Sequence, residues 1–168
     1  NQAPRIRVRP LGDLDFADGV DAVELSAGYG LTPDEWQGEG VVYGWMARGD
    51  DGRLAAGRCG LAVARQNGKN GTVETAQLHK MVLQGRKILH TAHEVKTARK
   101  AFQRLCSFFE NERKFPELAE LVKEIRRTNG QEAIVLTNGA SIEFVARSRG
   151  SGRGYTVDDL FCDEAQEM

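Results

Sequence analysis

The residues with the clearest chemical potential lie in one stretch, Val63-Ala64-Arg65-Gln66-Asn67-Gly68-Lys69-Asn70. It falls between an apolar run, residues 58–64, and a segment of helical periodicity that begins at Gly68. Backbone N–H groups in such a strand-to-helix loop cradle nucleotide phosphates, and a lysine there reaches the β and γ oxygens. Gly68 and Lys69 occupy the positions that this phosphate-binding loop (Walker A) requires.

Two positions depart from the general loop pattern. Val63 stands where the pattern has its first glycine, and Asn70 replaces the usual serine or threonine. Asn70 still offers a side-chain oxygen toward Mg²⁺, directly or through water. A Gly-Lys pair also occurs at ordinary helix starts, so that alternative stays open for this segment taken alone.

A second candidate segment is Leu160-Phe161-Cys162, an apolar run that Asp163 and Glu164 follow directly. A carboxylate at a strand end holds Mg²⁺ or its waters, and the next carboxylate can accept a proton from the attacking water. An isolated Asp-Glu pair is more often a helix cap. Together with the upstream loop, however, the pair favours a Walker A and Walker B arrangement.

Residues 147–155 are rich in arginine and glycine and precede the second segment. Guanidinium groups near a phosphate site suit either a γ-phosphate or DNA phosphates, whereas the alternative is a solvated glycine-rich loop. Arg147 ends a predicted strand and is expected to pair with an acid. Arg153 lies between Gly152 and Gly154, which would let it move.

The elements expected to carry these segments alternate along the chain. Helices are predicted over 16–27, 33–46, 68–84, 93–114 and 116–125, and strands over 58–64, 87–91, 133–137, 141–146 and 158–162, with an Asn138-Gly139 hairpin turn. Thr32 is expected to cap the second helix, with Pro33 in its first turn and Glu35 completing a capping box. The alternation predicts a three-layer α/β fold with a largely parallel central sheet.

Composition restricts the function classes. Lys plus Arg total 23 and Asp plus Glu total 24, a net charge of −1 that excludes a protein basic over its whole surface but allows a local basic patch. Three cysteines without a CxxC pair argue against a disulfide framework or a zinc site. His79, His90 and His93 are too scattered for a metal site, and His79 is expected on a helix surface. No apolar run reaches the ~18 residues of a membrane span, and no signal-peptide pattern opens the chain.

Four segments in this order resemble the large subunit of tailed-phage terminases, most of all the actinobacteriophage type. They are residues 65–70, 89–94, 148–154 and 160–166. The Arg-Gln-x-Gly-Lys form of the loop is characteristic of that family and accounts for the missing first glycine. The resemblance extends from about Leu31 to Met168.

The resemblance implies a P-loop NTPase fold of the additional-strand (ASCE) type that hydrolyses ATP with Mg²⁺ and packages double-stranded DNA into a procapsid in the host cytoplasm. It implies a homo-oligomeric ring, with the small terminase subunit and the portal as further partners and no membrane. The implied organisation is a lead-in over residues 1–57 and an ATPase core over residues 58–168, incomplete after Walker B. The family's nuclease domain, which would also make the whole protein an endonuclease, has no residues in this sequence.

Residue roles follow from the resemblance position by position. Phosphate binding is assigned to the loop and the start of its helix: Arg65, Gln66, Asn67, Gly68, Lys69, Asn70 and Gly71. Asp163 matches the Mg²⁺ carboxylate, Asn70 is its companion ligand, and Glu164 matches the catalytic carboxylate.

Three further roles are implied. Arg65 matches a loop arginine near the γ-phosphate. Arg153 is the expected trans-acting arginine among Arg147, Arg149 and Arg153, with Arg149 as runner-up. Contact with DNA phosphates is the competing role for all three. Gln37 matches the glutamine motif that recognises adenine, and a plain surface position on its helix is the alternative.

Two other functions stay open. A helicase-like ATPase of the same P-loop group would need its own coupling motifs and a second ATPase lobe. A non-catalytic nucleotide- or DNA-binding module would use the loop only as a switch, and Asn70 favours that hypothesis.

Overall fold

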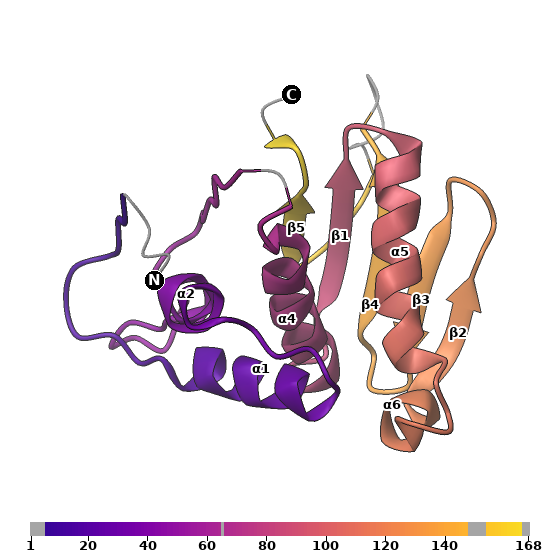
Figure 1. Cartoon of the computed structure of the whole chain (residues 1–168), viewed down its shortest axis with the longest axis horizontal. Coiled ribbons are helices and arrows are strands. Elements are labelled where there is room, and N and C mark those ends of the chain that lie inside the picture. The colour runs from indigo at the N-terminus through magenta and orange to yellow at the C-terminus, as the bar shows by residue number, and fades with distance from the viewer. Residues whose placement is uncertain (1–5, 65, 148–153, 166–168) are drawn as a thin grey trace. The chain divides into compact units, whose positions relative to one another are not determined.

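The computed structural model describes residues 6–64, 66–147 and 154–165. The chain divides into two compact units, Asn1–His79 and Lys80–Met168, and the division falls inside one continuous helix, α4 (Lys69–Val82) (Figure 1). Within the described residues, no helix is both long enough and apolar enough to cross a membrane.

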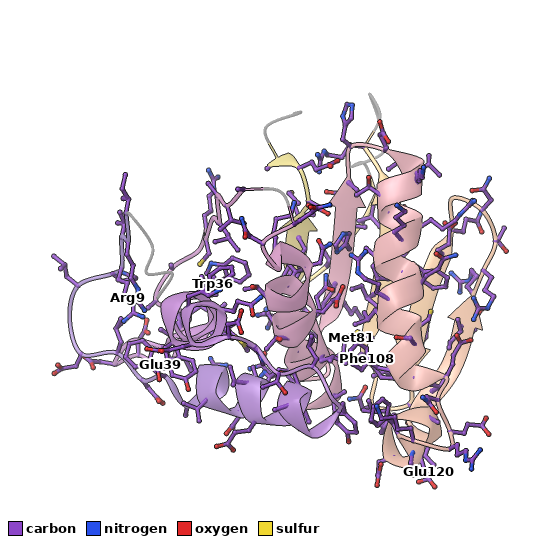
Figure 2. The ribbon with its side chains drawn as sticks, viewed as in Figure 1. Arg9, Trp36, Glu39, Met81, Phe108 and Glu120 are labelled. Atoms are coloured by element: carbon purple, nitrogen blue, oxygen red, sulfur yellow. The ribbon has the colours of Figure 1, made fainter. Side chains whose placement is uncertain are left out.

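The first unit is helical. Its elements before α4 are α1 (Ala17–Gly28), α2 (Glu35–Gln37), the π-helical turn η1 (Gly38–Val42) and α3 (Tyr43–Met46). The helix predicted over 16–27 is confirmed, and the one predicted over 33–46 is interrupted by the π turn. Arg9 donates a hydrogen bond to the Glu39 carbonyl at 2.7 Å, which fastens the segment before α1 to this turn (Figure 2).

Helix α2 begins later than the sequence analysis predicted. Asp34, not Thr32, is the N-cap, and its backbone N–H donates to Gln37 Oε1 at 2.7 Å in a capping box. The predicted box of Thr32 and Glu35 is therefore wrong. Both pairs have the spacing of the motif, but only the second places Gln37 where it also contacts Gly68.

The second unit contains a mixed sheet. Its strands among the described residues are β1 (Lys87–Ala92), β2 (Val122–Arg126), β3 (Glu132–Leu136), β4 (Ser141–Ala146) and β5 (Asp159–Cys162), in the order β2-β3-β4-β1-β5. β1 pairs in parallel with both β4 and β5, whereas β2, β3 and β4 pair antiparallel. The predicted α/β class is thus confirmed, with the parallel pairs in the centre of a mixed sheet.

Helix α5 (Val95–Phe109) packs on β4, β1 and β3 and is followed by the short α6 (Pro116–Glu120) (Figure 1). Its apolar spacing buries Phe102, Leu105 and Phe109, as periodicity predicts. The Phe102 ring meets the Phe144 ring of β4 edge-on at 5.6 Å between centroids. This contact holds the helix against the centre of the sheet.

Three further predictions are wrong. Residues 58–64 form no strand, because no described strand takes their backbone hydrogen bonds. Residues 122–126 form β2 rather than the end of a helix. The pairing of β2 with β3 shifts register between Val122 and Glu124. This shift interrupts the alternation of apolar and polar residues that identifies a strand, so the apolar residues have a spacing that resembles a helix. His79 is only 2% exposed, not on the surface, since α4 is buried on its polar side as well.

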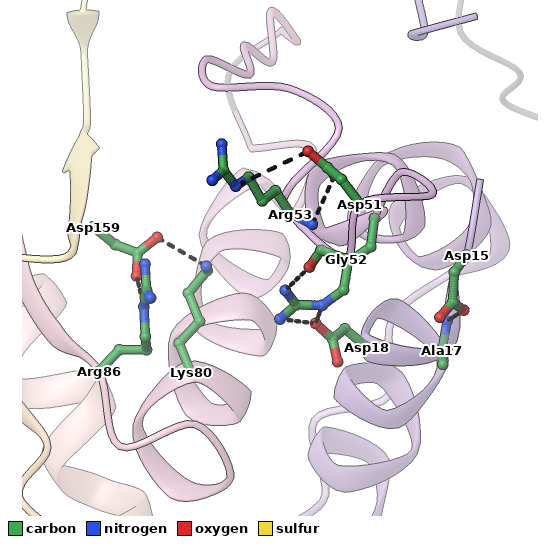
Figure 3. A network of polar contacts seen from close by, with 10 residues as sticks. Asp15, Ala17, Asp18, Asp51, Gly52, Arg53, Lys80, Arg86 and Asp159 are labelled. Atoms are coloured by element: carbon green, nitrogen blue, oxygen red, sulfur yellow. Dashed lines mark hydrogen bonds and ion pairs between the residues drawn. The ribbon is translucent and has the colours of Figure 1, made fainter. Parts of the chain in front are cut away.

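A buried ion network joins the last turn of α4 to β5 (Figure 3). Lys80 Nζ and Arg86 Nε each lie 2.8 Å from a carboxylate oxygen of Asp159, and the Lys80 and Asp159 side chains are 8% and 13% exposed. Burial acts to raise the pKa of Asp159, but the hydrogen bonds and charges of Arg86 and Lys80 outweigh it and lower that pKa. The same hydrogen bond raises the pKa of Arg86.

We expect Asp159→Asn to lower the free energy of unfolding by about 2–3 kcal/mol at neutral pH, because it leaves two cations near a neutral side chain. The folded pKa of Asp159 lies below its unfolded value, so its contribution is present above the unfolded pKa, about 4, and is lost as the pH falls through the folded pKa. Urea unfolding at neutral and acidic pH measures both effects.

The exposed pair of Asp51 and Arg53 supplies the control, and Asp51→Asn is expected to change stability by less than about 0.5 kcal/mol. A difference between Asp159→Asn and the unaltered chain that stays constant down to acidic pH would contradict this account of the network.

Candidate functional site

The first candidate segment is the loop that leads into α4. Gly68 has a φ of +73° and Gln66 a φ of +63°. Glycine adopts this left-handed conformation freely, whereas another residue loses about 1 kcal/mol or more. Lys69 is the first residue of α4 and half-buried, and Asn70 beside it is exposed. The backbone N–H groups of the first turn of α4 therefore directly follow the strained loop, an arrangement that suits an anion.

Gln37 fastens α2 to this loop. Its side chain is 7% exposed, and its Nε2 donates to the Gly68 carbonyl at 2.8 Å. A Cβ built at Gly68 would lie 2.6 Å from Gln37 Nε2. The same built Cβ would lie 3.9 Å from Cζ2 of Trp36, which is labelled in Figure 2. Only glycine therefore fits at position 68, on conformational and steric grounds.

The side-chain amide of Gln37, which the sequence analysis assigned to adenine recognition, already makes hydrogen bonds within the chain. The side-chain oxygen accepts from the Asp34 N–H, and one amide N–H is used on Gly68. In this structure Gln37 thus positions the loop through its own hydrogen bonds. It is buried, not the plain surface residue that was the alternative.

The second candidate segment follows β5, at the edge where the parallel strands β4, β1 and β5 end. Asp163 N–H donates to the Thr91 carbonyl at 2.8 Å, and Glu164 N–H donates to Asp163 Oδ1 at 2.9 Å. Glu164 has a φ of +54°, and both acids are half-buried. The ends of parallel strands are where ligands bind in open α/β sheets.

Arg147, expected to pair with an acid, contacts uncharged oxygens instead: it donates to Thr91 and to the backbone carbonyl of Glu164. The other predicted arginines, Arg65, Arg149 and Arg153, lie outside the described residues. The sequence analysis did not predict the contact between Thr91 and Arg147. It could have been inferred from their positions, because both lie at the ends of predicted strands, and the ends of parallel strands meet at one edge of the sheet.

The structure places the predicted residues in two groups, each within its own unit. Gln37 and the segment Gln66–Gly71 belong to the first, and Asp163 with Glu164 belongs to the second. Within the described ranges, no three His, Cys, Asp or Glu side chains gather in a way that could hold a metal ion. Asn70 and Asp163 are the oxygen donor types that Mg²⁺ accepts beside phosphate and water.

Backbone strain marks both groups. Gln66 and Glu164 are the two non-glycine residues with positive φ in the part of the chain that the structure describes. One lies in each candidate segment. Strained conformations persist where the surroundings enforce them, and they cluster at functional sites.

The sequence matches no protein-family model and no curated protein. These residues and their geometry are therefore what a functional proposal depends on.

We expect Gly68→Ala to lower the free energy of unfolding by more than about 1 kcal/mol, because a Cβ there meets Gln37 and the φ is left-handed. Gly71→Ala is the matched control. Its Cβ would make only ordinary contacts, 3.5 Å to Leu31 and 3.7 Å to Gln37, and alanine favours the helix by up to about 1 kcal/mol. Thermal and urea unfolding compare the two. Equal effects of the two substitutions would contradict the assigned role of Gly68.

Proposed function

We propose that the chain is the ATPase part of a DNA-packaging motor similar to the large terminase subunit of tailed phages. It binds ATP with Mg²⁺ and uses hydrolysis to drive double-stranded DNA into a procapsid, in the host cytoplasm. It acts as a homo-oligomeric ring with a small terminase subunit and a portal. The proposed fold is a three-layer P-loop NTPase of the additional-strand type.

The observation that carries the proposal is the left-handed backbone at Gln66 and at Glu164. The two candidate segments are defined by residue chemistry alone, a phosphate-binding pattern in one and adjacent carboxylates in the other. Each contains one of the two strained non-glycine residues of the described chain. That coincidence supports a functional origin for both segments, because a plain helix start or a helix cap does not require such strain.

In the proposed site, the phosphates lie against the loop and the first turn of α4. The N–H groups at the helix start and the Lys69 ammonium supply positive charge there. Gln37 holds the Gly68 carbonyl, so the loop is shaped before a nucleotide arrives. Gln37 retains one amide N–H for an adenine edge, and Arg65 and Arg153 keep their proposed places near the γ-phosphate.

The carboxylates have different roles. Asp163 and Asn70 are the proposed ligands of Mg²⁺, which neutralises phosphate charge when bound. Glu164 orients the attacking water and accepts its proton. The hydrogen bond from the Glu164 backbone N–H to Asp163 Oδ1 holds the Asp163 side chain against the backbone of Glu164.

A non-catalytic nucleotide switch is the second candidate, favoured by Asn70 at the position of the usual hydroxyl residue. It predicts binding without turnover.

Lys69→Ala should weaken nucleotide binding strongly and abolish hydrolysis, because it removes the charge that faces the phosphates.

Glu164→Gln should retain binding but lower turnover by at least about 100-fold, because an amide cannot accept the proton of the water. Phosphate release with and without DNA, together with binding of a fluorescent nucleotide, measures both in the intact protein.

Two exposed residues away from both segments give matched controls, Lys123→Ala and Glu117→Gln, and both should behave as the unaltered protein. Turnover at the normal rate in Glu164→Gln would remove Glu164 from the proposed mechanism. Nucleotide binding by the unaltered protein with no turnover in the presence of DNA would favour the switch.

A further inference from the structure

Arg147 is held at the edge of the sheet where the carboxylates lie. It directly follows β4, and its backbone N–H donates to the Ala92 carbonyl at 2.8 Å. That bond continues the parallel ladder beyond its last pair, Ala92 and Ala146. The Cα of Arg147 is therefore positioned by regular sheet pairing.

The guanidinium of Arg147 joins the ends of two other strands. Nη1 lies 3.3 Å from the Thr91 carbonyl and 3.2 Å from Thr91 Oγ1, at the end of β1. Nη2 donates to the Glu164 carbonyl at 2.8 Å, just after β5. One planar group thus connects three strand ends, and both of its terminal nitrogens are used within the chain.

Glu164 needs such support. Its left-handed φ of +54° is unfavourable for a residue with a Cβ. The Asp163 N–H is held by Thr91, the Glu164 N–H by Asp163, and the Glu164 carbonyl by Arg147. The bond from Arg147 restrains the Glu164 carbonyl, and without it the backbone would relax toward a negative φ.

We infer that Arg147 is a positioning residue for Glu164: by fastening the Glu164 carbonyl to the end of β1, it sets the direction of the catalytic carboxylate. This rests on the proposed function, which makes Glu164 the proton acceptor. Arg147 then touches neither nucleotide nor water. This role differs from the phosphate or DNA contact for which the sequence makes Arg147, Arg149 and Arg153 candidates.

The position requires arginine rather than any cation. A lysine has a single nitrogen and cannot reach both the Thr91 and Glu164 oxygens with the fixed spacing of a guanidinium. The Arg147 Nε is buried with no hydrogen-bond partner in the described part of the chain. An unsatisfied buried N–H is destabilising, so stability alone does not account for the choice of arginine.

The test is a double-mutant cycle between Arg147→Lys and Glu164→Gln in the intact protein, with single-turnover hydrolysis and nucleotide affinity as readouts. We expect Arg147→Lys to lower the hydrolysis rate about 10- to 100-fold, as a small misplacement of a catalytic group does. Nucleotide affinity should change less than about threefold, since the residue does not touch the nucleotide. In the Glu164→Gln background, Arg147→Lys should have no further effect.

Arg126→Lys on the edge strand β2 is the matched control and should leave both readouts unchanged. Additive losses in the double variant, or normal hydrolysis by Arg147→Lys beside an inactive Glu164→Gln, would overturn the inference and leave the proposed function intact. Absence of hydrolysis by the unaltered protein would instead overturn the proposed function, and this inference with it.

Discussion

Parallel strands end at the same edge of a sheet, and the pairing of β1 with both β4 and β5 applies this rule to three segments that are far apart in the sequence. One residue from each segment lies at its strand end: Thr91 in the last part of β1, Arg147 after β4 and Asp163 after β5. Their hydrogen bonds to one another follow from the register and need no special loop. The left-handed Glu164 is then imposed by its neighbours, so the placement of the carboxylate is a consequence of sheet pairing. Helix α5 packs on two of these strands, β1 and β4, and on β3.

The loop before α4 is shaped by a different interaction. The Gln37 side-chain amide donates to the Gly68 carbonyl and accepts from the Asp34 N–H. One side chain therefore forms both the capping box of α2 and the contact with the loop. Gln66 and Gly68 both have a positive φ in this loop. In each unit, a side chain donates a hydrogen bond to the backbone carbonyl of a residue with positive φ, Gly68 in one and Glu164 in the other. Preorganisation of this kind reduces what a ligand must reorder on binding.

The sequence predicted elements whose signals are local. Helix α1, the hairpin of β3 and β4 around Asn138-Gly139, and the strand before Asp163 were all found as predicted. Predictions failed where the deciding partner is distant. β2 is stabilised by its pairing with β3 despite an irregular register, and residues 58–64 have strand-like composition without a described neighbour. The contacts of Arg147 and Gln37 were not predictable for the same reason, since a spacing pattern identifies a residue type but not the carbonyl that it meets. The two candidate segments are recognisable in the sequence because the proposed chemistry requires particular residue types close together in the chain.

The proposed function requires that the loop at Gly68 and Lys69 and the pair Asp163 and Glu164 serve one nucleotide with its metal ion. Paramagnetic broadening measures this directly, with Mn²⁺ in place of Mg²⁺ and a non-hydrolysable ATP analogue added to the ¹⁵N-labelled chain. The account predicts that amide signals of residues 66–70 and of residues 163–164 broaden together and only when the nucleotide is present, while those of β2 stay sharp. Broadening at one segment without the other, or at neither, would contradict it.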